Sequence, residues 1–326
     1  MNVSIIICTR DRADSLRETL RSIGQCEVTA DLAAELLVVD NGSSDRTRQT
    51  VESTQLDNMP VRYIHEPRTG LCRARNRGLA EVNSDIFLFT DDDVRVPTDW
   101  IERMCRPIAC GAADAVAGGV KIAPALERDW LRGFVRIWLA STADMVGQQD
   151  LQLIGANMAF SRRVLEKVPS FDTELGAGAL GFADETLFSW QIVRAGYKLI
   201  DNLRAEVEHH FDAARLTREA FLAMAERMGR SNAYVQYHWE HQRLRNPRLL
   251  ELWYLGKLKL RTALTNTSKG TTSPKPWELS YTSKIHFARQ YMRESRRPHN
   301  YQKHGLRKVQ PACGLGLANR AEAAAC

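Results

Sequence analysis

The sequence predicts an α/β fold, in which a doubly wound, mostly parallel sheet is followed by a helical C-terminal extension. Two patterns predict this fold class. Over the first 95 residues, short apolar runs rich in β-branched residues alternate with segments of helical spacing, as in strand–helix–strand units of parallel sheets. In the last third, long helical patterns replace the strands. The 326 residues suffice for one large core with an appendage.

The first part of the chain contains predicted strands separated by helices. The strands are apolar runs at 3–8, 36–39, 61–65 and 86–90. Helices are expected at 14–22, 46–53 and 70–82. In the first of these helices, Leu16, Leu20 and Ile23 recur on one face at helical spacing.

The middle of the chain mixes both patterns. Strands are predicted at 115–122, 153–160 and 199–207, and helices at 130–139 and 184–194. Gly196 is the expected C-terminal cap of the second helix. The segment 169–184 contains Gly176, Gly178 and Gly181, and we expect a mobile loop there.

The last third is predicted to be helical at 216–242, 247–264 and 278–295, with a linker at 265–276. We therefore expect an α/β domain over 1–212, with halves 1–95 and 96–212, a basic helical extension over 213–310 and a poorly ordered tail over 311–326. Residues 1–210 hold 24 Lys and Arg against 31 Asp and Glu, whereas residues 211–326 hold 21 against 8. Such a basic part can face an anionic membrane, an acidic polymer or nucleic acid, or be a solvated basic face.

The expected compartment follows from features that the sequence lacks. No run of about 18 apolar residues is present, so no membrane-spanning helix is expected. The chain opens with a strand pattern instead of a signal peptide. Its 7 cysteines show no paired short spacing, which indicates free thiols in a reducing environment. Together these features predict a cytoplasmic protein.

Polar clusters follow several predicted strands at their carboxyl ends, at 9–12, 40–45 and 91–93. Ligands of doubly wound sheets bind at that edge, so the clusters indicate a nucleotide or polyphosphate site. Asp91 and Asp93 lie on the same side of an extended chain. Mg²⁺ or Mn²⁺ commonly links such carboxylates to substrate phosphates. The alternative is a solvated acidic turn.

Several segments resemble family 2 nucleotide-sugar glycosyltransferases. They lie within 2–212 in the order that the family shows: 4–12 (SIIICTRDR), 38–45 (VVDNGSSD), 70–78 (GLCRARNRG), 89–94 (FTDDDV), 155–160 (GANMAF) and 183–197, which begins ADET and ends AGY. The resemblance implies a Rossmann-like fold of the GT-A type, in which the DXD motif holds Mn²⁺ or Mg²⁺.

The resemblance also implies which residues bind the donor and the metal. The expected donor-binding residues are Thr9, Arg10, Asp11, Asp40, Arg68, Arg75, Asp91 and Asp92. Asp40 is expected to accept a hydrogen bond from the base, unless it only bonds its own turn. Arg68 or Arg75 is expected at the diphosphate. The expected metal ligands are Asp91, Asp93 and one of two adjacent histidines, with His210 preferred over His209.

On the acceptor side, Asp184-Glu185 stands where many family members carry Glu-Asp. This match implies that Glu185 is the catalytic base; Asp184 is the base if the alignment shifts by one residue, and otherwise an N-cap. The expected acceptor pocket comprises Gly155, Ala156, Asn157 and Trp190. We expect an inverting displacement in which the base removes the acceptor proton, under a lid formed by the glycine-containing loop.

The resemblance implies a nucleotide-diphospho-sugar donor, with a UDP-sugar favoured, and a glycan or lipid-linked acceptor in surface polysaccharide or glycolipid assembly. One alternative is a nucleotidyltransferase-like enzyme, although the loop at 9–12 lacks the glycines typical of that class. Another is a non-catalytic binding protein acting through its basic last third. No nucleic-acid motif is evident there, so no nucleic-acid partner is expected. The segment 248–264 mixes leucines with Lys and Arg, which fits peripheral binding to the inner face of an anionic membrane, or a helix packed on the domain or in a dimer.

Overall fold

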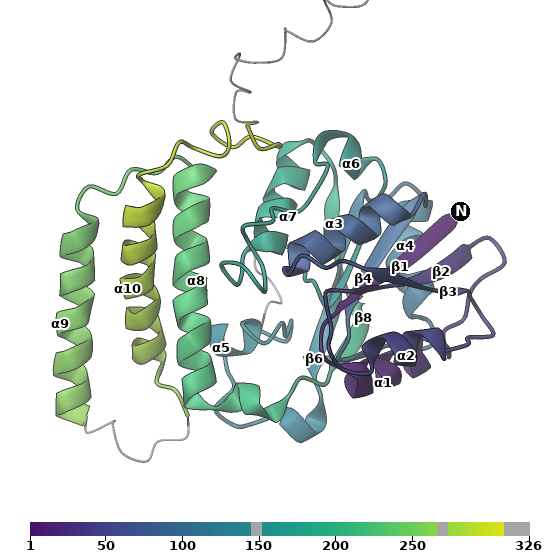
Figure 1. Ribbon diagram of the computed structural model, residues 1–326, viewed down its shortest axis with the longest axis horizontal. Helices are drawn as coiled ribbons and strands as arrows, with labels where there is room; N and C mark the ends of the chain where they lie inside the picture. Colours follow the sequence, from purple (N-terminus) through teal and green to yellow (C-terminus); the bar gives the residue numbers. More distant parts are fainter. Residues whose placement is uncertain (145–151, 266–272, 310–326) are drawn as a thin grey trace, which may run out of the picture.

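The computed structural model describes residues 1–144, 152–265 and 273–309. Its centre is an eight-stranded sheet with the strand order β3-β2-β1-β4-β7-β6-β8-β5 (Figure 1). The strands are β1 (Asn2–Thr9), β2 (Ala33–Asp40), β3 (Val61–His65), β4 (Ile86–Asp91), β5 (Val94–Arg95), β6 (Ala115–Ile122), β7 (Asn157–Ser161) and β8 (Leu199–His209).

The sheet is mostly parallel. β1 pairs in parallel with β2 and β4, and β2 with β3, whereas β7 runs antiparallel between β4 and β6. The register places Thr9 opposite Asp40 and Cys8 opposite Asp91. The strands of the first half therefore end at one edge, and the polar clusters that follow them meet there.

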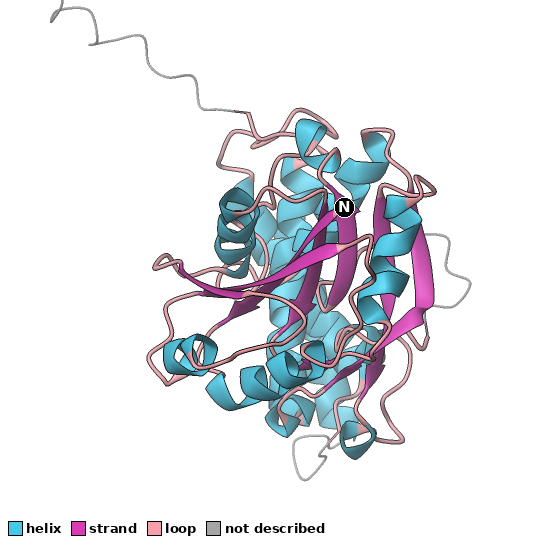
Figure 2. Cartoon of the chain, turned by 90° about the vertical axis from the view of Figure 1, so that its right-hand side faces the viewer, coloured by secondary structure: helices cyan, strands magenta, loops and turns pink. Residues whose placement is uncertain are grey.

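Helices cover both faces of the sheet, with the strands in the interior (Figure 2). Alternate residues of β1 divide between two cores: Ile5 and Ile7 pack with α1 and α4, and Ile6 packs with α3. The helices before the extension are α1 (Ala13–Ile23), α2 (Thr47–Glu52), α3 (Leu71–Glu81), α4 (Trp100–Ala109), α5 (Phe134–Ile137), α6 (Val164–Lys167) and α7 (Asp184–Arg194), with a 3₁₀ turn η1 (Pro124–Leu126).

The extension consists of a 3₁₀ turn η2 (Ala213–Leu216) and the helices α8 (Arg218–His238), α9 (Pro247–Thr265) and α10 (Pro276–Glu294). α10 lies between α8 and α9 (Figure 1). The segment after α10 returns to the α/β region, where the hydroxyl of Tyr301 donates to Oδ2 of Asp172 over 2.7 Å. The extension is thus tied to the sheet-bearing part of the chain.

Several predicted elements have different bounds in the structure. The helix expected at 130–139 shortens to α5, because Gly133 (φ +58°) and Ala140 (φ +67°) adopt left-handed backbone on either side. The strand expected from residue 153 starts only at Asn157. α4 is not among the predicted elements, although Ile101, Met104 and Ile108 recur at helical spacing in it. The tail predicted at 311–326 lies outside the described residues.

The structure bears on two of the features from which the compartment was predicted, the helices and the cysteines. Among the described residues, no helix combines the length and the apolar character needed to cross a bilayer. Five cysteines fall within the described parts of the chain, and each is a free thiol: Cys8, Cys26, Cys72, Cys105 and Cys110.

Candidate active site

A cavity of about 300 Å³ lies at the carboxyl ends of β1 and β4. Its volume is at the lower end of the range that small-molecule sites occupy. The lining residues come from the ends of β1, β4 and β8 and the segments that follow them, from the residue after β2, from the region where α3 begins and from the loop before α7. They are Cys8, Thr9, Arg10, Arg12, Asn41, Thr69, Gly70, Leu71, Ala74, Asp91, Asp92, Asp93, Ala177, Gly178, His209 and Arg215. The predicted strand-end clusters at 9–12 and 91–93 therefore meet at one cavity.

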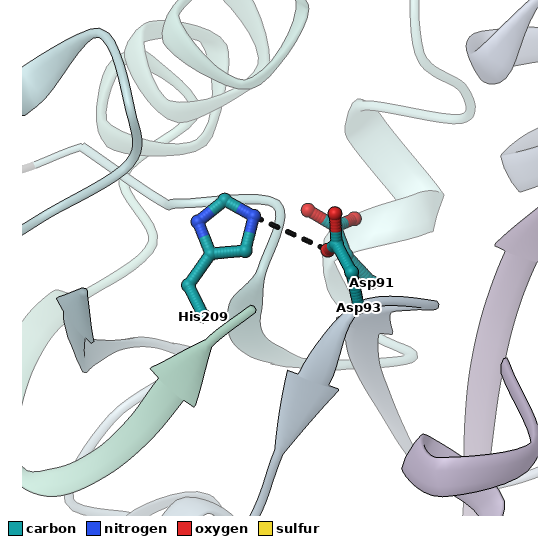
Figure 3. Close-up of side chains that lie close together, drawn as sticks. All are labelled: Asp91, Asp93 and His209. Atoms are coloured by element: carbon teal, nitrogen blue, oxygen red, sulfur yellow. Dashed lines mark ion pairs between the residues drawn. The ribbon is translucent and has the colours of Figure 1, made fainter. Parts of the chain in front are cut away.

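Asp91, Asp93 and His209 point toward one another at this cavity (Figure 3). One ligand atom of each lies within 4.8 Å of the others. Nε2 of His209 is 3.2 Å from Oδ1 of Asp93. Pairing of β5 with β8 sets Val94 opposite His209, which brings the end of β8 beside the acidic segment.

The cluster fits a divalent cation. Nδ1 of His209 lies 3.0 Å from the carbonyl oxygen of Leu139, and a ring that donates there turns its Nε2 lone pair toward Asp93. Oδ1 of Asp93 is buried and makes no hydrogen bond within the described residues. In that tautomer, Nε2 of His209 and Oδ1 of Asp93 can both ligate one cation, and two ligands at right angles around Mg²⁺ or Mn²⁺ lie about 3 Å apart. Carboxylate and imidazole ligands suit both ions.

The histidine of this cluster is His209; the preferred His210 lies outside it, and its role as a metal ligand stays a prediction. Neighbouring residues on a strand point to opposite sides, and His209 is the one that faces Asp93. Nε2 of His210 instead lies 2.6 Å from Oε1 of Glu208, outside the cavity lining. The backbone N–H of His210 donates to the carbonyl oxygen of Asp93 over 2.7 Å, which keeps the two segments together.

Asp92 is held by two neighbours from the loop after β1. Thr9 donates its hydroxyl to Oδ2 over 2.7 Å, and Nη1 of Arg12 donates to Oδ1 over 3.1 Å. Burial, and then repulsion from Asp93, raises the pKa of Asp92 to about 7. Burial also opposes ionisation of Asp93, but His209, when its Nε2 carries a proton, and Arg12 outweigh it and lower the pKa of that carboxyl. Arg12 is absent from the predicted site residues, although its place in the strand-end cluster pointed to it.

The predicted diphosphate arginines, Arg68 and Arg75, form ion pairs with acidic residues, and their contact with a diphosphate stays a prediction. Nε of Arg68 lies 2.9 Å from Oε1 of Glu66, and neither arginine lines the cavity. The cations that line it are Arg10, Arg12 and Arg215. No local motif marks Arg215, because it reaches the cavity from η2, far along the chain from the acidic triplet.

Arg75 instead joins the two acids at the start of α7. Its Nη1 lies 2.6 Å from Oδ2 of Asp184, and its Nη2 lies 2.9 Å from Oε1 of Glu185. Asp184 is buried, whereas the Glu185 side chain is 24% exposed. A Cβ at position 155 would lie 2.3 Å from Oε1 of Glu185 and 2.2 Å from Nη2 of Arg75, so a larger residue there would displace the ends of these side chains.

The two carboxyls share one proton. Burial, and then the charge of Glu185, raises the pKa of Asp184 to about 8. Burial alone would raise the pKa of Glu185 as well, but Arg75 and a hydrogen bond from Asp184 outweigh it and lower that pKa. At neutral pH the protonated Asp184 donates to the ionised Glu185, and the single negative charge faces the guanidinium of Arg75. Of the two acids, the exposed and ionised Glu185 is the better candidate for a base.

Asp11 and Asp40 lie near the cavity without lining it. The oxygens of Asp40 accept hydrogen bonds from the hydroxyl of Tyr63 and the backbone N–H of Ser43, each over 2.8 Å. Asp11 accepts from the backbone N–H of Ser44 over 2.7 Å. Both carboxylates therefore shape the loop after β2. The expected contacts of Asp40 with a base and of Asp11 with the nucleotide stay predictions.

The predicted acceptor residues separate in the structure. Gly155 lies beside Glu185, and the carbonyl oxygen of Ala156 accepts from Thr90 over 2.8 Å. Asn157 is fully buried, and its side-chain amide bonds Gly119, Ala205 and Trp100. Trp190 stacks on Trp239, the residue after α8, at 5.5 Å between ring centroids. The polar atoms of Asn157 are thus used inside the core, and its placement in an acceptor pocket stays a prediction.

The loop before α7 closes one side of the cavity. Ala177 and Gly178 line it, and the carbonyl oxygen of Ala177 accepts from the backbone N–H of Leu71 over 2.8 Å. Gly178 (φ +82°) approaches Gly70, where a Cβ would lie 3.0 Å from the Gly70 Cα. The loop therefore lies where a lid would; its mobility stays a prediction.

The sequence is similar to known glycosyl transferases over part of its length. The sequence model described as glycosyl transferase family 2 matches residues 4–169, half of the chain. The succinoglycan biosynthesis protein ExoM of Rhizobium meliloti is 32% identical over 136 residues, which cover 40% of this chain and 43% of ExoM. The dolichol-phosphate mannosyltransferase of Pyrococcus furiosus is 30% identical over 149 residues, 45% of this chain and 41% of that protein. The chain thus spans less than half of the length of either relative.

Solved structures show a similar fold. The mannosyltransferase PcManGT of Pyrobaculum calidifontis, in complex with GDP-Man and Mn²⁺, matches with a TM-score of 0.59 at 19% identity, over 89% of this chain and 86% of that one. Residues 1–349 of S. aureus TarS, in complex with UDP, match with a TM-score of 0.51 at 14% identity, over 91% of each chain. The predicted α/β fold of the GT-A type with C-terminal helices is confirmed.

Proposed function

Because the chain belongs to glycosyl transferase family 2, we propose that it transfers a sugar from a nucleotide-diphospho-sugar to an acceptor hydroxyl with inversion at the anomeric carbon. The observation that carries this proposal is the cluster of Asp91, Asp93 and His209 beside a cavity that Arg10 and Arg215 also line. A nucleoside diphosphate is an anion, and a metal ion and arginine side chains are the partners that stabilise its phosphates.

The metal site supports the donor half of the reaction. Asp91, Asp93 and His209 would hold Mn²⁺ or Mg²⁺, which would supply positive charge against the negative charge on a departing diphosphate. Arg215, which also lines the cavity, offers its guanidinium to the phosphate oxygens. Asp92, fixed by the hydroxyl of Thr9, accepts a hydrogen bond from a ribose or sugar hydroxyl. A UDP-sugar is the favoured donor, and the TarS structure with UDP supports testing it first.

Glu185 is proposed as the general base. Its Oε1 is held by Nη2 of Arg75, which leaves Oε2 to take the proton from the acceptor hydroxyl as that oxygen attacks. Asp184, protonated at neutral pH, fixes the orientation of Glu185 and keeps the charge of the pair at minus one. The loop with Ala177 and Gly178 excludes water from the cavity and so limits hydrolysis of the donor.

The acceptor is proposed to be a lipid-linked glycan in surface polysaccharide or glycolipid assembly, presented at the cytoplasmic face of a membrane. The printed names of the relatives, a succinoglycan biosynthesis protein and a dolichol-phosphate mannosyltransferase, support this class. Each of these names belongs to a protein that the chain matches over less than half of its length.

Calorimetric titration of UDP, GDP and dTDP, each with and without Mn²⁺, tests the donor site. We expect one nucleotide to bind far more tightly than the others, and only with the metal. The Asp93→Asn variant should lose this metal-dependent binding. Failure of all the nucleotides to bind in either condition overturns the proposed function and directs attention to the basic extension.

A further inference from the structure

The helix α9 turns an apolar face to solvent. Leu249, Leu252, Trp253, Leu260 and Leu264 are each between 60% and 76% exposed, and no residue of α9 is buried. A surface helix of a globular protein normally points such a stripe at the core. Figure 1 shows α9 as the outermost helix, with α10 and α8 between it and the sheet. The stripe therefore faces away from the rest of the molecule.

These residues form one continuous stripe. Leu252, Trp253, Leu260 and Leu264 follow Leu249 by three, four, eleven and fifteen positions, which places the five residues within about 120° around a helix of 3.6 residues per turn. Gly256 and Ala263 fall within the same sector, so no polar side chain interrupts the stripe. We call the stripe of Leu249, Leu252, Trp253, Leu260 and Leu264 the α9 face.

Basic residues border the α9 face on both sides. By the same spacing, Arg248 and Lys259 lie along one edge, and Lys257 and Arg261 lie along the other. Nζ of Lys257 lies 4.6 Å from the centre of the Trp253 ring, so its stem covers part of the aromatic surface. Long basic side chains at the edge of an apolar stripe can reach lipid phosphates while their stems stay in the apolar layer.

The opposite side of α9 is fixed against α10 by specific contacts. Oε1 of Glu251 accepts from Nε of Arg289 over 2.7 Å, and the rings of Tyr254 and Tyr281 lie 5.6 Å apart. The guanidinium of Arg261 lies 5.0 Å from the centre of the Trp277 ring. These contacts fix the orientation of α9 about its own axis, so the α9 face points away from α10.

We propose that the α9 face binds the headgroup region of an anionic lipid bilayer, with the helix axis in the plane of the membrane. An apolar face with Trp and Leu, bordered by Lys and Arg, is the composition of interfacial helices, and tryptophan is favoured at that depth. The proposal concerns binding alone and does not depend on the transfer reaction, because no α9 residue lines the catalytic cavity.

Charge selects a lipid surface over a second copy of the chain. Glu251 is the acidic residue in the α9 sequence, and it is paired with Arg289 on the inner side. Two α9 faces in contact would bring basic edges together with no acidic residue of α9 between them, and like charges at such an edge repel. An anionic bilayer supplies the missing negative charge at both edges at once.

Flotation of the full chain with vesicles tests the proposal. We expect binding to vesicles that contain phosphatidylglycerol and phosphatidylcholine, weak binding to pure phosphatidylcholine, and loss of binding as salt is raised. The double variant Leu252→Glu/Leu260→Glu should lose at least about a hundredfold in vesicle affinity, because two apolar anchors become charged. Neutralising Arg248 and Lys259 as glutamines should cost about thirtyfold on anionic vesicles only.

Two matched control variants distinguish binding through the α9 face from non-specific binding of the chain to vesicles. Val193 of α7 is also an exposed apolar residue, and Val193→Glu should leave vesicle binding unchanged. Arg46→Gln, which removes an exposed cation near α2, should do the same. Vesicle binding that survives the double glutamate variant, or no binding by the unaltered chain, overturns the proposal. A concentration-dependent dimer that the same double variant dissolves assigns the α9 face to a second copy instead. Nucleotide binding measured on each variant reports separately on the catalytic site.

Discussion

Nη1 of Arg75 lies 2.6 Å from Oδ2 of Asp184, while Nη2 of the same guanidinium lies 2.9 Å from Oε1 of Glu185. One fixed arginine therefore orients both acids at the start of α7. Since burial raises the pKa of Asp184 and the arginine lowers that of Glu185, the two adjacent carboxyls are distinct at neutral pH.

Replacement of the two acids should have unequal effects on turnover. In Asp184→Asn, the amide can still accept from Arg75 and donate to Glu185, as the protonated acid does, so most of the activity at pH 7 should remain. Glu185→Gln removes the proton acceptor and should lower kcat by about 10² to 10⁴ with donor affinity retained. Steady-state kinetics with each variant check this order. The reverse order would assign the base to Asp184.

Asp184 should make the folded protein less stable as the pH rises. Its pKa is about 8 in the folded chain and about 3.9 in an unfolded chain, so the folded state holds a proton that the unfolded state releases. The stabilising contribution is complete below about pH 4 and is lost progressively up to the folded pKa. Between pH 6 and pH 8, the free energy of unfolding should fall by on the order of 2 kcal/mol. Urea denaturation at several pH values measures it, with Asp184→Asn as the variant in which the fall disappears; a wild-type curve that is flat over this range contradicts the shared proton.

The adjacent histidines provide an internal comparison for the metal site. His209→Gln should abolish Mn²⁺-dependent nucleotide binding, because it removes Nε2 from the cluster with Asp91 and Asp93. His210→Gln is the matched control and should bind as the unaltered chain does, since that ring is paired with Glu208. Calorimetry with Mn²⁺ and nucleotide distinguishes them. Equal losses in both variants would show that the strand end, and not one imidazole, is what the metal requires.

Arg215 should matter to the donor, and Arg68 should not. Arg215→Ala removes a cation that lines the cavity and should weaken nucleoside diphosphate binding about tenfold to a hundredfold, the range for hydrogen bonds to charged groups. Arg68→Ala removes a cation paired with Glu66 outside the cavity and should change binding little. Titration of both variants with the same nucleotide tests which arginine contacts the diphosphate. A large loss of affinity in Arg68→Ala alone would assign this contact to Arg68, as the sequence predicted.

Replacing Asn157 should lower the stability of the folded protein. Asn157→Ala leaves the carbonyl oxygens of Gly119 and Ala205 and the indole N–H of Trp100 without their present partner. Unsatisfied buried groups cost roughly 1 to 3 kcal/mol each, so we expect a loss of about 3 kcal/mol or more in the free energy of unfolding. Denaturation in urea measures it. A stable variant with impaired transfer would return Asn157 to the acceptor pocket.

Much of the fold and part of the site follow from local patterns. The apolar runs at 3–8 and 86–90 predict strands because their residues suit a sheet buried on both faces, and the polar residues after them, Thr9 and Asp91 among them, lie at the same edge because parallel strands end together. Helix α9 was also predictable within a residue of its bounds.

Contacts between residues far apart in the chain could not be predicted from local patterns and follow from the folded structure. The choice of His209 over His210 depends on which side of β8 faces Asp93, and this follows from the pairing of β8 with β5 and β6. The engagement of Arg75 by Asp184, and the arrival of Arg215 at the cavity, depend on the packing of α3, α7 and η2. The alternation of strands and helices and the polar residues at the strand ends can be read from the chain, because they depend on near neighbours. The partner of each side chain depends on the folded arrangement, because burial and charge act between residues whose separation in space is not given by their spacing in the sequence.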